Sequence, residues 1–417
     1  MSKIKKIKRD MLQQKNIIYL TQKYNTPLWL YNAQIIKNQI KKLKQFDVIR
    51  FAQKSCSNIN ILKFIKSCGV TVDAVSLGEI QRAILAGFTA KNNDLVYTSD
   101  ILERNTLKKI IQYNIPVNIG SLDMVKILGK ASPGHHVWLR INPKFGDGHH
   151  IKTNTGGENS KHGIWDIEQA ISEIKRYHLL LIGIHMHIGS GINESNIEKM
   201  CNTMIHSTLK IKQNIQFISA GGGLNIPYHK KEREVNIKKY FNIWNTTRNI
   251  IASKLSCPIK LEIEPGRFLV AQSGVLIAQV CSVKKVGNNH FIILDAGFND
   301  LMRPMLYGSY HKISVIYKDS RPMFLEKTME YIISGPLCES GDVFTIKKNG
   351  SLLKRKLPII FPEDYIVIHD TGAYGASMSS NYNSRPLIPE ILYKNNNFYE
   401  IRKRQSMKEL LKLEILN

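Results

Sequence analysis

The stretch from Val48 to Ser76 reads VIRFAQKSCSNINILKFIKSCGVTVDAVS. It begins with an apolar, β-rich segment, Val48–Lys54, continues with an amphipathic helical segment, Ile59–Ser67, and ends with a second β-rich segment, Val70–Ser76. A strand, a helix and another strand in this order predict a parallel βαβ unit.

The same alternation continues as far as Arg267, with Leu77–Ala86 as the next amphipathic helix. The further β-rich segments are Asp94–Ser99, Val117–Ser121, His136–Asn142, Leu180–Ser190, Phe217–Gly223 and Ile259–Arg267. About eight such units is the number that closes a (β/α)8 barrel. We therefore predict an α/β fold with a TIM-type barrel over residues 33–267.

After Arg267 the pattern changes, because turn signals replace the helical segments. The β-rich segments there are Val275–Val283, His290–Asp295, Met329–Ser334 and Tyr365–Asp370. They predict a mainly antiparallel β domain over residues 268–417. We expect a strand at Pro27–Tyr31, within residues 1–32, to join this domain, and Met407–Leu416 to form a short closing helix.

The charge is strongly positive, since 59 Lys and Arg oppose 33 Asp and Glu in 417 residues, a net +26. A basic chain invites a nucleic-acid interpretation. The lysines, however, are scattered along the whole chain, and no zinc-finger spacing, RNA-binding signature or long basic tail accompanies them. We favour a compositional bias toward Lys, Ile and Asn, and expect no nucleic-acid partner.

The cellular compartment is also indicated by composition. No apolar run reaches the ~18 residues of a membrane helix, and the basic N-terminus lacks the apolar stretch of a secretory signal. The six cysteines form no CxxC pair and no cluster with metal-ligand spacing. We expect a cytoplasmic protein with no membrane contact, no disulfide framework and no metal.

Polar or glycine residues end nearly all of the predicted barrel strands. They are Lys54, Ser76, Ser99, Ser121, Asn142, His187, Gly221–Gly223 and Arg267. In a (β/α)8 barrel the C-terminal strand ends converge on the face that carries the site. Turns that merely end strands would explain serine and glycine well, but would explain Lys54, His187 and Arg267 poorly.

Two of these strand ends suggest how a phosphorylated ligand could be bound. Lys54 follows an apolar strand, where partial desolvation would free its amine for a Schiff base; a solvated lysine is the plainer alternative. Gly221–Gly223 let the backbone approach a ligand closely, so that N–H groups could hold a phosphate; a tight turn is the plainer alternative.

The other two strand ends offer a carboxylate and an imidazole. Glu264 and Arg267 lie in the sequence EPGR, which is either part of a site or a surface ion pair. His185 and His187 share one face of a strand, where they could bind a metal, or where His187, nearer the strand end, could stack on a planar ring. A lysine, a phosphate cradle, a stacking histidine and a carboxylate together indicate a pyridoxal phosphate site.

Long motifs then match a known family. From about Pro27 to the C-terminus the chain resembles the fold-type III, pyridoxal-phosphate-dependent decarboxylases, and among them those that act on diaminopimelate. The motifs are FAQKSCSNINIL, DAVSLGEI, HMHIGSG, SAGGGL, LEIEPGRFLVAQSG, DAGFNDLMRPMLYGSYH, GPLCESGD and DTGAYGASMSSNYNSRP. The resemblance implies conversion of meso-2,6-diaminopimelate to L-lysine and CO2, the last step of lysine biosynthesis.

The resemblance also implies roles for single residues. Lys54 would bind pyridoxal 5'-phosphate covalently, His187 would stack on its ring, and Glu264 would hold the pyridine nitrogen protonated. The implied cofactor-binding set is Lys54, Asp73, Glu79, His187, Ser190, Gly221, Gly222, Gly223, Glu264, Pro265, Gly266, Arg267 and Tyr374. The implied substrate-binding set is Arg267, Arg303, Tyr307, Glu339 and Tyr374.

Cys338 and Glu339 match a pair that the opposite subunit supplies in this family, which implies a homodimer with shared active sites. Cys338 is the candidate acid that returns a proton to the substrate carbon, and packing in the interface is its plainer role. The glycine-rich segment Gly146–Gly157 is either a flap over the site or a surface loop. Ser55 stands where many relatives carry alanine.

Other activities remain as alternatives. An ornithine- or arginine-type decarboxylase would share Lys54, His187 and the EPGR sequence, but Arg303 suits a second substrate carboxylate, whereas a distal ammonium would require an acidic group. A racemase of the same barrel type should lack the GPLCESGD motif. A single-domain cofactor-binding protein would not need the β-rich C-terminal third.

Overall fold

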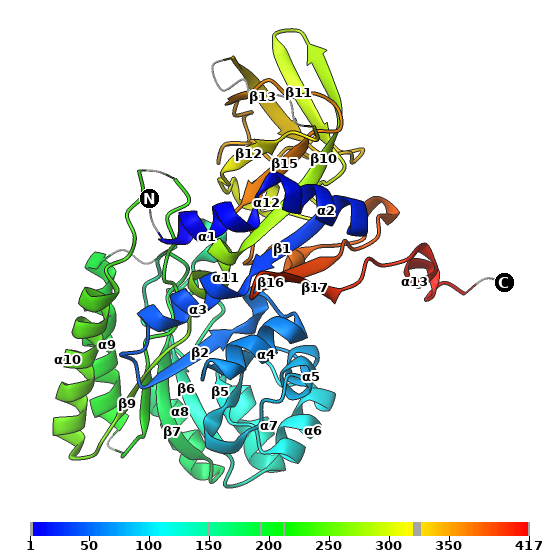
Figure 1. Cartoon of the computed structure of the whole chain (residues 1–417). Coiled ribbons are helices and arrows are strands. Elements are labelled where there is room, and N and C mark those ends of the chain that lie inside the picture. Colours follow the sequence, from blue (N-terminus) through cyan, green and yellow to red (C-terminus); the bar gives the residue numbers. More distant parts are fainter. Residues whose placement is uncertain are drawn as a thin grey trace. The chain divides into compact units, whose positions relative to one another are not determined.

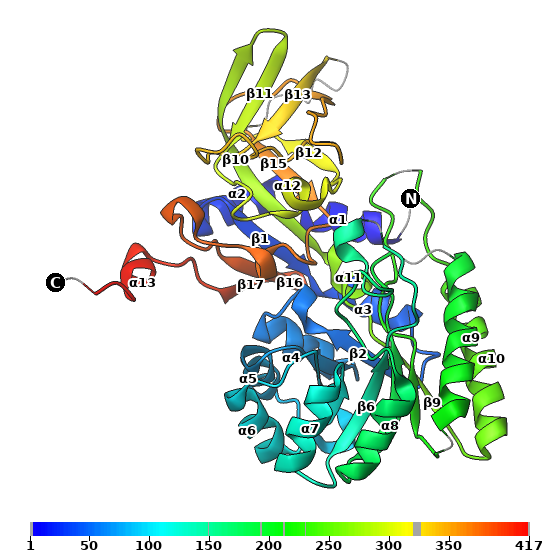
Figure 2. The same cartoon turned by 180° about the vertical axis from the view of Figure 1, so that it is seen from behind.

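The computed structural model describes residues 3–148, 150–191, 194–211, 213–229, 231–319 and 327–415. It contains two compact units, which Figures 1 and 2 show from opposite sides. The barrel unit comprises Lys37–Ile226 and Glu234–Leu269, and the sheet unit comprises Met1–Ile36, Pro227–Arg233 and Val270–Asn417. The predicted domain boundary between residues 267 and 268 stays a prediction. Limited proteolysis would test whether the two segments fold independently.

The barrel unit contains a closed barrel of parallel strands. Each strand pairs with the next along the chain, and the last returns to the first through Val48 opposite Glu262 and Ile49 opposite Ile263. The strands are β2 (Val48–Ala52), β3 (Thr71–Ala74), β4 (Leu95–Ser99), β5 (Val117–Ile119), β6 (His136–Ile141), β7 (Leu180–Met186), β8 (Phe217–Ser219) and β9 (Lys260–Ile263). The predicted TIM-type barrel is confirmed.

Helices alternate with these strands and lie around the outside of the barrel (Figure 1). They are α4 (Ile59–Ser67), α5 (Leu77–Leu85), α6 (Arg104–Tyr113), α7 (Leu122–Ala131), α8 (Ile167–Arg176), α9 (Glu194–Ile211) and α10 (Ile237–Leu255), with α3 (Ala33–Lys42) before the first barrel strand. Ser76 and Ser121 cap α5 and α7 by accepting hydrogen bonds from the Glu79 and Met124 N–H groups. These two strand-end serines therefore start helices.

Aromatic side chains fill part of the barrel interior. The rings of Trp138 on β6 and Phe217 on β8 lie 5.2 Å apart between centroids, packed with Val96 and Ile182. Gly183 on β7 makes room for the indole, because an added Cβ there would lie 2.6 Å from the Trp138 ring. A close-packed core of this kind holds the strand ends in fixed positions.

A buried ion pair also links the first and last barrel strands. The Arg50 Nε and Nη2 donate to the two Glu262 oxygens at 2.8 and 2.7 Å, and the side chains are 2% and 1% exposed. Arg50 Nη1 donates to the Asn93 carbonyl at 2.7 Å. The bidentate geometry and the extra hydrogen bond are what such a pair needs to offset desolvation.

Replacing Arg50 with methionine should lower the free energy of unfolding by about 3–5 kcal/mol, because it leaves the Glu262 carboxylate buried without its partner. Urea unfolding of the cofactor-free protein measures this. The double variant Arg50→Met/Glu262→Leu removes both charges and should recover most of the loss. A single variant as stable as the wild type would contradict the proposed role of the pair.

The sheet unit is built on a mixed, mainly antiparallel sheet. Its path is β14–β13–β11–β10–β1–β16–β17, with β15 paired to β10 and β12 paired to β15. The strands are β1 (Leu28–Asn32), β10 (Gly274–Val286), β11 (Asn289–Leu294), β12 (Ile313–Ile316), β13 (Thr328–Ser334), β14 (Arg355–Pro358), β15 (Tyr365–His369), β16 (Glu390–Lys394) and β17 (Asn397–Arg402). The antiparallel β architecture is confirmed, and the N-terminal strand β1 lies between β10 and β16.

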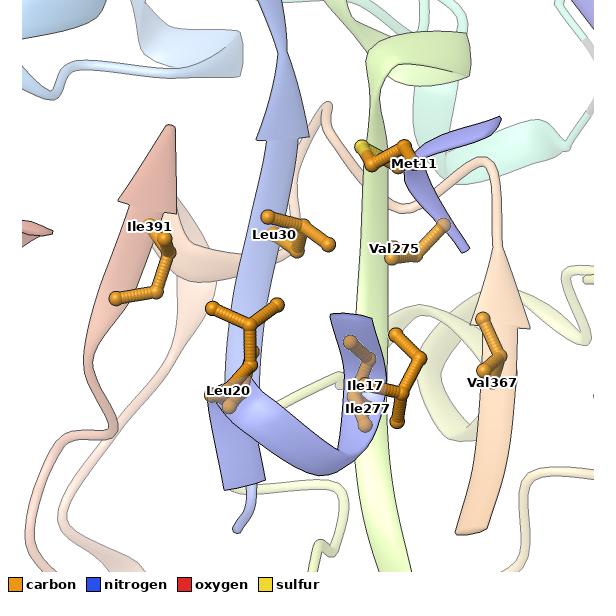
Figure 3. Close-up of a cluster of buried hydrophobic side chains, with 9 residues drawn as sticks. Met11, Ile17, Leu20, Leu30, Val275, Ile277, Val367 and Ile391 are labelled. Carbon is orange, nitrogen blue, oxygen red and sulfur yellow. The ribbon is translucent and has the colours of Figure 1, made fainter. Parts of the chain in front are cut away.

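Two N-terminal helices, α1 (Lys3–Met11) and α2 (Gln14–Tyr24), pack on this sheet. Figure 3 shows Ile17 and Leu20 of α2 over the strands that carry Leu30 and Ile277, with Val367 on the strand beside them. The sequence did not predict these helices. Their apolar side chains recur between lysines and other polar residues, in a stretch that is basic as a whole.

Three short helices complete the described chain: α11 (Arg267–Val270), α12 (Arg303–Tyr307) and α13 (Met407–Leu411). Ser406 and Glu409 form a capping box at the start of α13, where the sequence predicts a helix. α13 has no buried residue, so it does not cover a hydrophobic core. The end of the predicted segment, residue 416, lies outside the described residues. Among the described residues, no helix combines the length and apolar character needed to cross a bilayer.

Candidate active site

The C-terminal end of β2 continues into a 3-10 turn, Gln53–Ser55, that carries Lys54. The buried neighbours of Lys54 fix this turn, since Gln53 Nε2 donates to the Glu79 carbonyl at 3.1 Å and Ser55 Oγ to the Ala52 carbonyl at 2.9 Å. Lys54 itself is exposed. The expected partial desolvation of its amine is therefore not seen in this structure and stays a prediction.

The ends of β3 and α5 bring two acidic side chains to the same end of the barrel. Asp73 is buried, and its Oδ1 has no hydrogen-bond partner among the described residues. Burial and the nearby Glu264 carboxylate raise the pKa of Asp73 to about 6. Burial raises the pKa of Glu79 to about 7, although its carboxylate accepts a hydrogen bond from the Val75 N–H at 2.9 Å.

Glu264 follows β9 and is held by two neighbouring strands. His185 Nε2 on β7 bonds to Oε2 at 2.8 Å, and Ser219 Oγ on β8 donates to Oε1 at 2.8 Å. Burial by itself would raise the pKa of Glu264, but the attraction and hydrogen bonds of these partners lower it to about 2. Glu264 is therefore a fixed carboxylate at neutral pH.

His187 lies just beyond β7, half-buried, with its Nδ1 buried and without a hydrogen-bond partner in the described part of the chain. Burial, helped by the charges of Arg140 and Lys54, holds the pKa of His187 well below its usual value. The imidazole is therefore neutral near pH 7. It offers a flat, uncharged face of the kind that stacks on a planar ring.

Gly221–Gly223 follow β8 and pack against the backbone at the ends of neighbouring strands. Gly221 has a φ of 64°, and an added Cβ would lie 2.3 Å from the Met186 carbonyl oxygen. At Gly222 an added Cβ would meet the Glu264 carbonyl oxygen at 2.6 Å and the His187 ring at 3.7 Å. The run therefore lies against both His187 and Glu264, and only glycine fits there.

The remaining cofactor candidates of the barrel unit lie in the segments that follow β7 and β9. Ser190 is half-buried, and its N–H donates to the Thr153 carbonyl at 3.3 Å. The Pro265 carbonyl accepts a hydrogen bond from the Ala52 N–H at 3.3 Å. An added Cβ on Gly266 would lie 3.2 Å from Ser55 Oγ. The EPGR turn therefore lies beside the turn that carries Lys54. Arg267 is buried at the start of α11.

Sequence reasoning missed Arg140, a further buried cation of the barrel unit. It lies on β6 at 8% exposure, and burial lowers its pKa against the attraction of Asp100, Glu264 and Asp73. An arginine inside the apolar segment HVWLRIN was the available signal. Near Arg140, His162 Nδ1 bonds to Asp100 Oδ2 and ties the loop after β6 to the end of β4.

The segment 146–157, of which residue 149 lies outside the described residues, is bonded to the end of β7. The Asp147 and Thr155 N–H groups both donate to the Ile188 carbonyl, at 3.0 and 3.1 Å. Thr155 Oγ1 donates to the His187 carbonyl at 3.1 Å. The segment thus lies beside the candidate site, and its movement as a flap stays a prediction.

Within the sheet unit, three tyrosines surround the buried Arg303 at the start of α12. The Arg303 Cζ lies 5.8 Å from the ring centroid of Tyr228 and 5.9 Å from those of Tyr307 and Tyr374. Arg303 Nη2 donates to Ser309 Oγ at 3.2 Å. Sequence reasoning predicted Tyr307 and Tyr374 but missed Tyr228, whose segment lies far from the others in sequence.

Cys338 and Glu339 lie on an exposed turn of the sheet unit. The Cys338 N–H donates to Asn383 Oδ1 at 3.1 Å. The buried Asp342 accepts from the N–H groups of Phe298 and Leu337, both at 2.8 Å. The turn is therefore rigidly held while the thiol and the carboxylate face outward. Among the described residues no three His, Cys, Asp or Glu side chains gather as metal ligands.

Comparison with known proteins shows which family this chain resembles. Residues 32–271 match the family model "Pyridoxal-dependent decarboxylase, pyridoxal binding domain". A diaminopimelate decarboxylase of Buchnera aphidicola subsp. Baizongia pistaciae is 57% identical over 409 residues, 98% of each chain. A crystal structure of diaminopimelate decarboxylase matches with a TM-score of 0.94 at 55% identity, covering 96% of each chain. A Helicobacter pylori diaminopimelate decarboxylase complexed with L-lysine matches with a TM-score of 0.82 at 30% identity, covering 95% of this chain and 99% of that one.

Proposed function

Because the chain belongs to the diaminopimelate decarboxylases, a family of pyridoxal-dependent decarboxylases, we propose that it converts meso-2,6-diaminopimelate to L-lysine and CO2, the last step of lysine biosynthesis. The observation that carries this proposal is the ionised Glu264 carboxylate, held by His185 and Ser219 next to the turn of Lys54. A carboxylate fixed in this way suits a protonated pyridine nitrogen.

The barrel residues fit pyridoxal 5'-phosphate. The Gly221–Gly223 backbone carries no side chain that would cover its N–H groups, and these groups, with the Ser190 hydroxyl and the Arg267 cation, suit a phosphate. The His187 face suits the pyridine ring, and the unpaired Oδ1 of Asp73 suits a polar group of the ligand. Pro265 and Gly266 form the turn beside Lys54. The Glu79 carboxyl group interacts with that of Asp73.

The bound cofactor supplies an electron-accepting ring that takes up the electron pair released as CO2 leaves. Lys54 would provide the amine that holds the cofactor. Glu264, with a pKa near 2, keeps its negative charge at the pyridine nitrogen. His187, neutral for the reasons given above, would stack on the cofactor ring without adding a competing charge.

The sheet unit supplies the groups for the substrate in this proposal. Arg303 is buried among tyrosines, where the low dielectric strengthens its attraction for the carboxylate that the reaction leaves in place. Tyr307 and Tyr374 border that guanidinium, and Arg267 and Glu339 complete the substrate set inferred from the family. An arginine here favours a dicarboxylic amino acid over ornithine, whose distal group is an ammonium.

We further propose a homodimer in which Cys338 and Glu339 serve the partner's site. Both side chains are exposed on a rigid turn, as groups that act in another subunit must be. A cytoplasmic location is proposed because all six cysteines are free thiols, which suits a reducing compartment.

Replacing Cys338 with alanine should lower kcat by roughly 10²–10⁴-fold, the usual contribution of a positioned general acid. The visible absorbance of the bound cofactor should persist, because Lys54 is untouched. Cys281→Ala, which removes another exposed thiol, is the matched control and should keep full turnover. Unchanged turnover in Cys338→Ala would refute the role of Cys338 as the acid.

The substrate assignment is tested by comparing kcat/KM for meso-diaminopimelate and for ornithine, with added pyridoxal phosphate. We expect diaminopimelate to be preferred by at least roughly 10²-fold, because a buried arginine left without its carboxylate costs a few kcal/mol. A preference for ornithine would overturn the assignment while leaving the cofactor proposal intact.

A further inference from the structure

The N-terminal helix α1 is attached to the end of β15 by an ion pair within the sheet unit. Lys8, in the last turn of α1, places its Nζ 2.5 Å from Asp370 Oδ1, and each side chain is 12% exposed. The two residues are 362 positions apart in the chain. A pair this well shielded from water is screened far less than a surface pair, so it fixes the relative position of helix and strand end.

The pair lies at the start of a tight turn that runs from Asp370 to Gly375. Asp370 and Tyr374 both adopt left-handed backbone conformations, with φ of 59° and 57°. Such a conformation costs a residue with a side chain about 1–2 kcal/mol. It persists only where the surrounding contacts determine the backbone.

Those contacts are specific. The Thr371 and Gly372 N–H groups donate to the Gly274 and Ala271 carbonyls at 3.0 and 3.1 Å. An added Cβ on Gly375 would lie 2.8 Å from the Trp29 ring. The middle and the end of the turn are thus held by the sheet, whereas at its start the Asp370 side chain is bonded to Lys8 of α1.

α1 can hold the Asp370 side chain in place because α1 and α2 are packed against the sheet. Met11, at the end of α1, is fully buried with Ile17 and Leu20 of α2 in the cluster shown in Figure 3. Lys8 is one helical turn before Met11, so its Cα is fixed by the same packing. At the other end of the turn, Tyr374 borders Arg303.

We propose that Lys8 is a positioning residue, whose ion pair with Asp370 holds the turn that carries Tyr374, a candidate contact of the cofactor and the substrate. This inference rests on the proposed function and on the family resemblance, which implies that Tyr374 contacts both the cofactor and the substrate. On this proposal Lys8 acts on cofactor binding only through Asp370 and the turn that Asp370 begins.

The test measures the affinity of the cofactor-free, full-length protein for pyridoxal phosphate by absorbance titration. Lys8→Met and Asp370→Asn should each weaken binding roughly 3- to 30-fold, a coupling typical of residues that act through a packed element. The double variant should bind no more weakly than either single variant. Lys8→Arg should restore affinity, and the control Lys6→Met, on the exposed side of α1, should match the wild type.

Steady-state kinetics distinguish a positioning role of Lys8 from a catalytic one. At saturating cofactor, kcat of Lys8→Met should stay within about twofold of the wild type, while KM for diaminopimelate rises in parallel with the cofactor dissociation constant. Unchanged cofactor affinity in both Lys8→Met and Asp370→Asn would overturn the inference, even if thermal stability fell. A wild-type protein that binds no pyridoxal phosphate would instead overturn the proposed function, and this inference with it.

Discussion

Lys54→Ala is expected to lose at least roughly 10⁴-fold in turnover, because no other amine of the barrel unit lies in the β2 turn to hold the cofactor and exchange it with the substrate. The visible absorbance of the bound cofactor should disappear with it. Purified protein supplemented with pyridoxal phosphate is compared with the wild type by lysine release and by absorbance.

Lys63→Ala is a matched control, since Lys63 is an exposed lysine on α4 of the same unit. It should keep wild-type turnover and absorbance. If Lys54→Ala retained more than about one hundredth of the turnover, the covalent role of Lys54 would be wrong, whatever its effect on folding.

Glu264→Gln should lower kcat by roughly 10²–10³-fold, the usual effect of removing one charge aimed at a reacting centre. The amide keeps the shape and can still bond to Ser219, but it carries no charge for the pyridine nitrogen. Ser219→Ala is the control, because it removes one 2.8 Å hydrogen bond and keeps the carboxylate, so its loss should stay within about tenfold.

The pH dependence follows from the lowered pKa of Glu264. A carboxyl group with a native pKa near 2, against about 4.3 when unfolded, contributes stability that is complete above about pH 5 and is lost as the pH falls toward 2. Wild-type stability should therefore fall more steeply than that of Glu264→Gln between pH 5 and 3. Parallel curves in acid denaturation would contradict the ionised state assigned to Glu264.

The barrel could be predicted because each of its strands is a short apolar run that ends in polar or glycine residues. The short edge strand β14 could not, since Arg355 and Lys356 interrupt its apolar pattern. The helices α1 and α2 were missed because few apolar residues stand among many lysines. Their burial depends on β1, β10 and β15, which come together only in the folded chain.

Within the site, Lys54, His187, Gly221–Gly223 and Glu264 could be inferred from their places at strand ends. Their charge states could not, because these depend on partners from other strands, such as Ser219 beside Glu264. Tyr228 is a similar case, since only the fold brings it to Arg303. The substrate came from resemblance alone, because an arginine near a tyrosine in sequence does not identify a dicarboxylic acid.

The most direct test of the central claim uses meso-diaminopimelate labelled in its carboxyl carbons and follows labelled CO2 and L-lysine together. We predict one CO2 and one L-lysine for each substrate molecule consumed, with the second carboxylate retained in lysine. Protein that binds pyridoxal phosphate but releases neither product from diaminopimelate would contradict the account.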